Sequence, residues 1–163
     1  MTSAAKPDSI NPSRRRLFNR RKDTALRPPW SRKDIEFTDV CTRCDACILA
    51  CETQILVRGD GGFPEIDFSR GECTFCQQCV SSCQEDLFNV NQQQPWLIVA
   101  TVSDNCLAHK GIFCQSCKDV CDPIAISFTP QIGKAPLPHI ALDTCTGCGA
   151  CVVPCPANAI TLA

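Results

Sequence analysis

Sixteen cysteines, gathered into four runs, constrain this chain more than any other feature of its sequence. In runs one, two and four the gaps between cysteines are two, two and three residues, whereas run three has seven residues in its first gap. The runs begin 32, 33 and 39 residues apart, which indicates four copies of one unit. Their members are Cys41, Cys44, Cys47, Cys51; Cys73, Cys76, Cys79, Cys83; Cys106, Cys114, Cys117, Cys121; and Cys145, Cys148, Cys151, Cys155.

This spacing is the one that two-cluster bacterial ferredoxins use to bind [4Fe–4S] clusters. Three cysteines two residues apart can curl around one cube, while backbone N–H groups of the curl offset its negative charge. Gly147 and Gly149 favour such a curl in run four, because glycine adopts positive φ readily. The fourth cysteine lies too far round to reach the same cube, so we expect it to ligate the cluster of a partner run. We therefore predict four [4Fe–4S] clusters held by all sixteen cysteines.

The sequence leaves open which runs exchange their fourth cysteines. We favour run one with run two and run three with run four. The alternative is a nested arrangement of run two with run three and run one with run four, and the stretches of 21, 22 and 23 residues between runs do not decide it. The favoured ligand sets are Cys41, Cys44, Cys47, Cys83; Cys73, Cys76, Cys79, Cys51; Cys106, Cys114, Cys117, Cys155; and Cys145, Cys148, Cys151, Cys121.

Run three departs most from the pattern, so its cluster is the one that the spacing supports least. Its seven-residue gap contains His109, which could replace Cys106 as a ligand. We favour the simpler interpretation, a surface loop with a solvated histidine. The sequence leaves open that His109 is a ligand instead of Cys106.

Zinc and disulfide bonds fit the cysteine runs less well. Zinc sites use four ligands from separated cysteine pairs, so runs this tightly bunched would leave thiolates over. Disulfides require an oxidising compartment. Arg14 and Arg15 resemble the start of an export signal, but polar and charged residues 19–23 follow where an apolar stretch is needed. Without that stretch we expect the protein to stay in the cytoplasm. No apolar run approaches the roughly 18 residues of a membrane span, so we expect no membrane span.

The four units predict a fold of the α+β class. Each unit reads as strand, cysteine loop, short helix and strand, which predicts small bacterial-type dicluster ferredoxin lobes. We expect a flexible basic arm (1–33), a first lobe with runs one and two (34–95) and a second lobe with runs three and four (96–163), divided at the polar stretch 91–95. The expected strands are 35–37, 55–57, 66–68, 87–90, 97–99, 125–128, 139–142 and 159–162.

Charge is divided unevenly along the chain. Residues 1–33 carry a net charge of +8 and the remainder −9, and bound clusters would make the remainder more negative. A cationic arm on an anionic body favours docking on a charged partner protein. The arm lacks the interleaved aromatic residues of a nucleic-acid binder, so we expect no nucleic-acid partner. The candidate partner-binding residues are Arg14, Arg15, Arg16, Arg20 and Arg21.

The sequence offers no catalytic machinery of a familiar kind. It contains no phosphate-binding loop, dinucleotide-binding motif or metalloprotease motif, and only two histidines. We therefore expect no catalytic residues and a role other than that of a self-contained enzyme.

Five segments together resemble those of one family over essentially the whole chain. They are Arg14-Arg15 on a basic arm, Arg27-Pro28-Pro29-Trp30-Ser31, Cys41-Thr42-Arg43-Cys44-Asp45-Ala46-Cys47, the Cys106-Leu107-Ala108 opening of the long-gapped run, and Cys145-Thr146-Gly147-Cys148-Gly149-Ala150-Cys151. In these segments the chain resembles the NapF family, the ferredoxin-type proteins of the periplasmic nitrate reductase system. The resemblance implies a cytoplasmic protein that contacts the precursor of the molybdenum-containing catalytic subunit before export. It further implies help with maturation of that subunit, through electron transfer or cluster assembly. A simple electron shuttle to a respiratory oxidoreductase is the alternative that the sequence leaves open.

Overall fold

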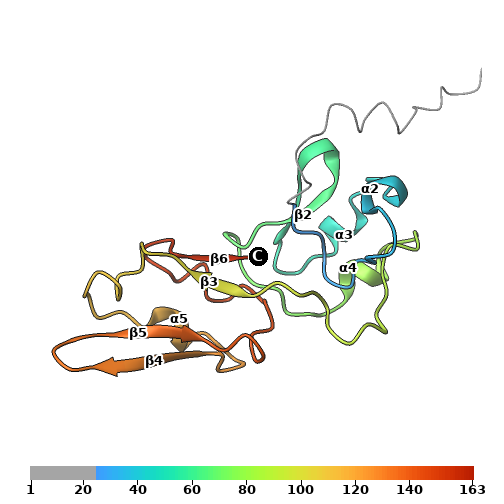
Figure 1. Ribbon diagram of the computed structural model, residues 1–163. Coiled ribbons are helices and arrows are strands. Elements are labelled where there is room, and N and C mark those ends of the chain that lie inside the picture. Colours follow the sequence, from blue (N-terminus) through green and yellow to red (C-terminus); the bar gives the residue numbers. More distant parts are fainter. Residues whose placement is uncertain (1–24) are drawn as a thin grey trace, which may run out of the picture.

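The computed structural model describes residues 25–163, so the five arginines expected to bind a partner lie outside the described residues. Figure 1 shows two parts side by side: the first half (residues 25–95) and the second half (residues 96–163), which is coloured yellow to red. The helices and strands of this part of the chain are short, and none of its helices has the length and apolar character needed to cross a membrane.

Four helices of four residues each lie close to the cysteine runs. Helix α2 (Phe37–Val40) precedes run one. The third cysteine of each of the first three runs lies in α3 (Ala46–Leu49), α4 (Gln78–Ser81) or α5 (Ser116–Asp119). Each of these three helices ends two residues before the fourth cysteine of its run, which therefore lies outside the helix.

The first half contains one hairpin between its two cysteine runs. Strands β1 (Leu56–Arg58) and β2 (Pro64–Ile66) are antiparallel and are joined through the 3-10 turn η1 (Asp60–Gly62). A single antiparallel bridge between Ser31 and Phe88 joins the beginning of this half to its end.

The second half has a similar arrangement with longer strands. Strand β3 (Ala100–Val102) pairs with β6 (Ile160–Leu162) and so joins the beginning of this half to its end. Between them, β4 (Ile126–Gln131) and β5 (Lys134–Ile140) form an antiparallel hairpin with an irregularity near Thr129. Both halves thus combine one long-range pairing with one local hairpin.

Four of the expected strands are absent or displaced. The strand expected at 66–68 is β2, which already ends at Ile66. Residues 35–37 form no strand, because Phe37 begins α2 instead, and so short an apolar segment does not distinguish helix from strand. Residues 87–90 contribute only the bridge at Phe88. The bridge does not lengthen into a strand pair on the N-terminal side of Ser31. There Trp30 has a positive φ of 61°, and the two prolines before it have no N–H groups to donate. The strand expected at 97–99 is displaced toward the C-terminus, where β3 begins at Ala100.

The end of the expected arm packs on the first half from residue 25 onward. The Leu26 carbonyl accepts a hydrogen bond from the Ile66 amide (2.9 Å), and the Arg27 guanidinium lies over the rings of Phe37 and Phe63. Trp30 is only 6% exposed and so anchors this segment to the body. The chain is therefore held to the body well before residue 33.

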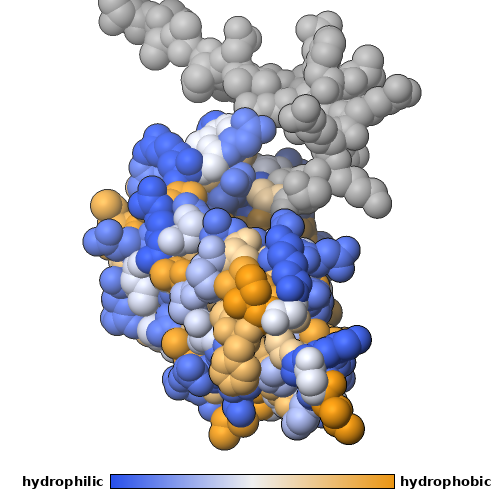
Figure 2. Space-filling model, turned by 90° about the vertical axis from the view of Figure 1, so that its left-hand side faces the viewer, coloured by the Kyte–Doolittle hydropathy of each residue, from blue (hydrophilic) through white to orange (hydrophobic). Residues whose placement is uncertain are grey.

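The apolar core is small and divided between the halves. In the second half Ala100, Ile126, Cys151 and Ile160 form one buried cluster. Other large apolar side chains remain exposed, among them that of Phe113. Figure 2 views the molecule from the end of the second half, where apolar residues lie among hydrophilic ones. A core of this kind stabilises a small domain only modestly, so bound clusters would add cross-links that it lacks.

Candidate iron–sulfur cluster sites

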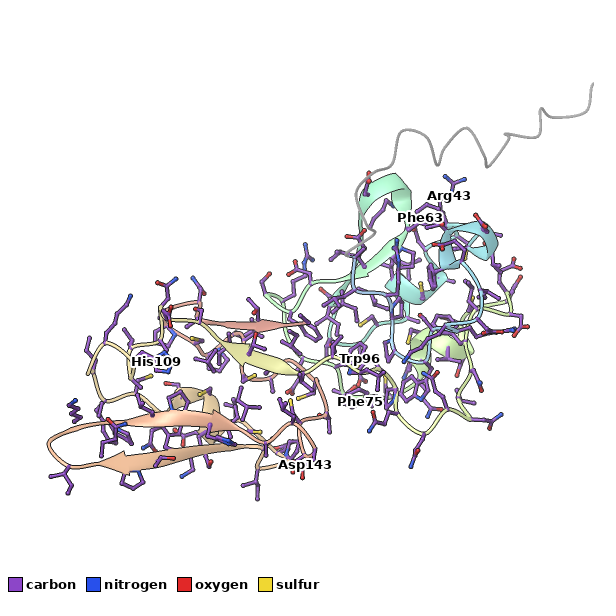
Figure 3. All side chains as sticks on the ribbon, viewed as in Figure 1. Arg43, Phe63, Phe75, Trp96, His109 and Asp143 are labelled. Atoms are coloured by element: carbon purple, nitrogen blue, oxygen red, sulfur yellow. The ribbon has the colours of Figure 1, made fainter. Side chains whose placement is uncertain are left out.

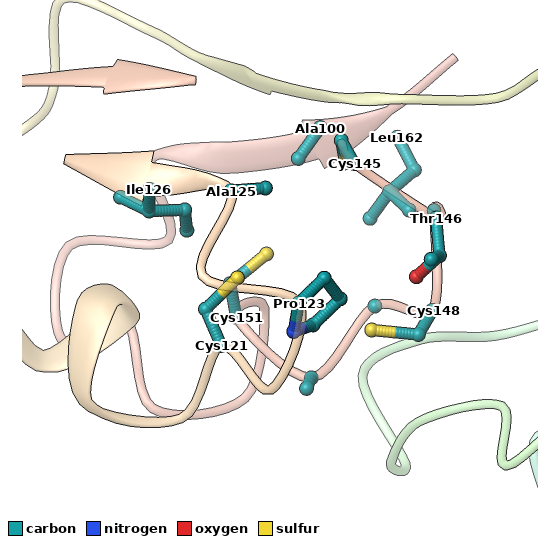
Figure 4. A pocket seen from close by; sticks show the side chains of 13 residues that line it. Ala100, Cys121, Pro123, Ala125, Ile126, Cys145, Thr146, Cys148, Cys151 and Leu162 are labelled. Atoms are coloured by element: carbon teal, nitrogen blue, oxygen red, sulfur yellow. The ribbon is translucent and has the colours of Figure 1, made fainter. Parts of the chain in front are cut away.

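Four cavities are each lined by four cysteines. Each encloses about 340 to 360 Å³ of space, part of it open to solvent. Figure 4 shows the cysteines of one of them, site 4, arranged around the cavity. The sets are Cys41, Cys44, Cys47, Cys83 (site 1); Cys51, Cys73, Cys76, Cys79 (site 2); Cys106, Cys114, Cys117, Cys155 (site 3); and Cys121, Cys145, Cys148, Cys151 (site 4).

Each set combines three cysteines of one run with the fourth cysteine of another. Run one exchanges with run two, and run three with run four, so the structure groups the thiols as in the favoured arrangement and not as in the nested one. Ligation of iron by these sixteen residues stays a prediction.

The curls of runs one, two and four share one backbone pattern. The residues on either side of the second cysteine have positive φ in each: Arg43 and Asp45 in run one, Gly147 and Gly149 in run four, and the residues at positions 75 and 77 in run two. Residues that alternate between right- and left-handed conformations turn successive N–H groups toward one concave side, which suits an anion. Non-glycine residues in this conformation are strained, and such strain concentrates at functional sites.

Run three reaches a similar cavity by another route. Neither residue between Cys114 and Cys117 has a positive φ, and the loop of the long gap supplies Cys106 to site 3. His109 is exposed on this loop and is not among the residues that line the cavity (Figure 3). The geometry favours Cys106 over His109 as the fourth donor.

The third cysteine of every run is withdrawn from solvent: Cys79 and Cys151 are buried, and Cys47 and Cys117 are half-buried. Burial, with a smaller contribution from neighbouring thiolates, raises the pKa of Cys79 and of Cys151 to about 12. The same causes raise the pKa of Cys47 and of Cys117 to about 11. As thiols these groups are protonated at neutral pH, so binding of iron must release their protons.

Two of the fourth cysteines, Cys51 and Cys155, accept hydrogen bonds from backbone N–H groups at their sulfur atoms. The amide of Ala159 donates to the Sγ atom of Cys155 at 3.3 Å. Burial acts to raise the pKa of Cys51, but hydrogen bonds from the backbone of Thr53, Ile55 and Leu56 and from the Thr53 hydroxyl lower it overall. These hydrogen bonds hold the two sulfur atoms in position, and at Cys51 they favour the thiolate form that a metal requires.

The donor set fits a [4Fe–4S] cluster. Such clusters are held by four cysteine thiolates, and each cavity presents four cysteines from two runs. Within the part of the chain that the structure describes, no three Cys, His, Asp or Glu side chains converge closely enough to bind a single metal ion. The thiols are instead spread around a larger space.

Sequence reasoning missed the aromatic residues that lie between sites 2 and 4. Phe68 and Trp96 pack edge to face at 5.9 Å, and the Phe68 ring presses on Gly149. The Trp96 indole N–H donates to the Thr146 carbonyl at 2.9 Å. No local pattern in the sequence marks these contacts, because the partners are at least 28 residues apart, and Trp96 and Thr146 are 50 apart.

Comparisons with known proteins agree with this chemistry. A family model described as a 4Fe-4S binding domain matches residues 138–161, around run four, and another with the same description matches residues 38–54, around run one. Together with the sixteen cysteines, these matches define the class: an iron–sulfur protein of the ferredoxin type that binds multiple [4Fe–4S] clusters. The predicted cofactor is thereby confirmed.

Individual relatives narrow the class further. Ferredoxin-type protein NapF of Escherichia coli (strain K12) is 43% identical over 155 residues, which cover 93% of this chain and 94% of the relative. Ferredoxin-type protein NapF of Haemophilus influenzae is 47% identical over 137 residues, covering 84% of this chain and 78% of the relative. Methylamine utilization ferredoxin-type protein MauM of Methylorubrum extorquens is 31% identical over 150 residues, covering 80% and 68%. The chain belongs to the NapF family of ferredoxin-type proteins, as the sequence motifs predicted.

Proposed function

We propose that this chain acts in the cytoplasm on the catalytic subunit of periplasmic nitrate reductase, and assists its maturation before export. The observation that carries the proposal is similarity to NapF proteins along almost the whole chain, at 43 to 47% identity. Clusters in the four sites would supply one-electron transfer, and the chain's own cysteines would hold and orient them. In this role the chain is a carrier or assembly factor, and the molybdenum-containing subunit performs catalysis.

The division of labour within the chain belongs to the same proposal. Each half acts as one dicluster ferredoxin lobe, with sites 1 and 2 in the first and sites 3 and 4 in the second. The basic arm recognises an acidic surface of the precursor, because opposite charges steer association and are screened by salt. The arm residues that would make this contact are Arg14, Arg15, Arg16, Arg20 and Arg21.

Capture of the precursor tests the proposal. Anaerobically prepared, cluster-loaded protein is immobilised, and retention of the purified nitrate reductase precursor is measured over a range of salt concentrations. We expect stable retention that weakens when the five arm arginines are replaced by Gln, most visibly at low ionic strength. Iron content should be the same in both proteins.

A matched control removes five exposed positive charges from the body instead. The control replaces by Gln the residues Lys33, Arg70, Lys110, Lys118 and Lys134. Retention should survive this change. Weak binding with rapid turnover of a respiratory oxidoreductase would indicate the electron shuttle instead. Capture that survives loss of the arm arginines but fails without cluster ligands would place the interface on the ferredoxin lobes.

A further inference from the structure

The two halves meet where sites 2 and 4 come closest. The Cys73 amide, in site 2, donates a hydrogen bond to the Cys148 carbonyl, in site 4, at 2.8 Å. Figure 4 shows the green segment of the first half passing beside Cys148. Ligand-bearing segments of two different halves are thus in direct backbone contact.

Aromatic side chains fill the rest of this joint. Trp96 packs edge to face on Phe75 at 5.7 Å and on Phe68 at 5.9 Å, and Phe75 in turn packs on Trp30 at 6.1 Å. Figure 3 shows Phe75 and Trp96 between the two halves. Trp30 and Phe75 line site 2. The aromatic row therefore runs from the wall of site 2 to the boundary of site 4.

On the other side of the joint, glycines in the loop of site 4 leave room for the aromatic rings. Its loop carries Gly147 and Gly149, both buried. A Cβ atom on Gly147 would stand 2.9 Å from the Trp96 indole nitrogen, and one on Gly149 would overlap the Phe68 ring. The absence of a side chain at Gly149 lets the loop approach Phe68 of the first half closely. Its absence at Gly147 makes room for Ile98 and Trp96 of the second half, and Trp96 in turn packs on the first half.

Within each half the two sites are also neighbours. In the first half, α3 and α4 pack together and carry Cys47 of site 1 and Cys79 of site 2. In the second half, Cys117 of site 3 packs against the core cluster that contains Cys151 of site 4. Sites 1 and 3 are thus linked to the joint through sites 2 and 4.

We propose that the four sites form one unbranched electron relay in the order site 1, site 2, site 4, site 3, joined across the halves by the Cys73–Cys148 hydrogen bond and the Trp96 contacts. The relay rests on the proposed function, because it requires loaded sites. With clusters held by these cysteines, a one-electron donor protein would be oxidised at one end site and a one-electron acceptor protein would be reduced at the other. One electron would pass for each turnover, and no covalent bond would form or break. Trp96 and Phe68 are positioning residues in this relay.

Paramagnetic pairs test the order directly. Replacing one cysteine ligand by Ala is intended to leave a three-iron cluster, which is paramagnetic when oxidised, while intact oxidised [4Fe–4S] clusters are not. The EPR spectrum of Cys76→Ala/Cys148→Ala, with one change in site 2 and one in site 4, should be broader than the sum of its single variants. The matched pair Cys44→Ala/Cys114→Ala, in sites 1 and 3, should equal that sum, because dipolar broadening falls steeply with distance. Equal or greater broadening in the second pair would overturn the order.

Hydrogen exchange provides a second measurement that does not depend on the three-iron clusters. In the loaded protein the Cys73 amide should be protected, and Trp96→Leu should make it exchange roughly tenfold faster. Phe63→Leu, which removes a ring buried in the first half away from the joint, should leave that rate unchanged. A Cys73 amide that exchanges like an open loop in the unsubstituted protein would refute the joint.

Both measurements use the chain alone, so their outcome is separable from precursor capture. The relay can fail while the precursor is still retained. Equally, capture can fail while the EPR and exchange results stand.

Discussion

Gly149 meets two separate demands, and only one of them is visible in the sequence. Its φ of +84° lies in the left-handed region, where a side chain costs roughly 1 to 2 kcal/mol. Runs one and two tolerate that cost: the residue after the second cysteine is Asp45 in run one and Gln77 in run two, and both have a φ of 62°. What excludes a side chain in run four is the ring of Phe68, which comes from the other half of the chain.

A pair of substitutions separates the two demands. Gly133, in the turn between β4 and β5, has a φ of +69° and open space around it, so Gly133→Ala should cost only about 1 kcal/mol. Gly149→Ala should cost about 3 kcal/mol, because the new methyl group must also displace the Phe68 ring. The measurement is the denaturant midpoint for loss of cluster absorbance in anaerobic protein. Equal midpoints for the two variants would show that the close approach is unimportant.

The short helices are the elements that divide each cysteine run between two sites. Helix α4 places Cys79 at site 2 and ends at Ser81, after which the chain carries Cys83 to site 1. Helix α3 does the converse, because Cys47 lines site 1 and Cys51 lines site 2. A helix of one turn, ended before the next cysteine, is therefore enough to exchange ligands between neighbouring runs.

Double substitutions test this exchange. Cys83→Ser should lower iron content by about one to four atoms, depending on whether a three-iron cluster remains or the site is emptied. With Cys44→Ser added the total loss should stay within about four atoms, because both residues line site 1, whereas adding Cys76→Ser, in site 2, should cause a second loss from another cluster. Iron and sulfide analysis of the anaerobic variants measures this. Additive loss with Cys44→Ser and none with Cys76→Ser would show that each run keeps its own fourth cysteine.

At the scale of the whole molecule, the cluster sites occupy positions where a larger protein would have its core. Buried apolar side chains are few, and Cys79 and Cys151 are themselves among the buried residues. Cysteines also surround the main cluster of the second half. Folding and cluster binding should therefore be strongly coupled, because free energy of binding becomes free energy of folding.

Iron stoichiometry is the prediction that belongs to this scale. Protein purified without oxygen and reconstituted with iron and sulfide should saturate at about sixteen irons per chain, which corresponds to four cubes. Metal analysis with EPR of the reduced protein measures it. Site 3 is the critical case, since run three builds it with a different loop. Reproducible saturation at about half that content would contradict the four-cluster proposal.

Spacing by itself determined the local chemistry of this protein. Cysteines separated by two residues are joined by so few bonds that three thiols of one run can reach only a common small space. This is why the cofactor class and the family could be predicted from the runs and their flanking residues. The strands predicted at 35–37 and 87–90 were wrong. Phe37 begins α2 instead, and residues 87–90 contribute only the bridge at Phe88, whose partner segment is limited by the positive φ of Trp30 and the prolines before it.

Tertiary structure alone decided the long-range arrangement. The choice between paired and nested runs, the place of Cys106 rather than His109 beside site 3, and the joint at Cys73 and Cys148 all depend on contacts between distant segments. A linker of 21 to 23 residues can reach either partner. The outcome therefore depends on which surfaces pack together, here α3 on α4 and the aromatic rings on the loop of Gly149.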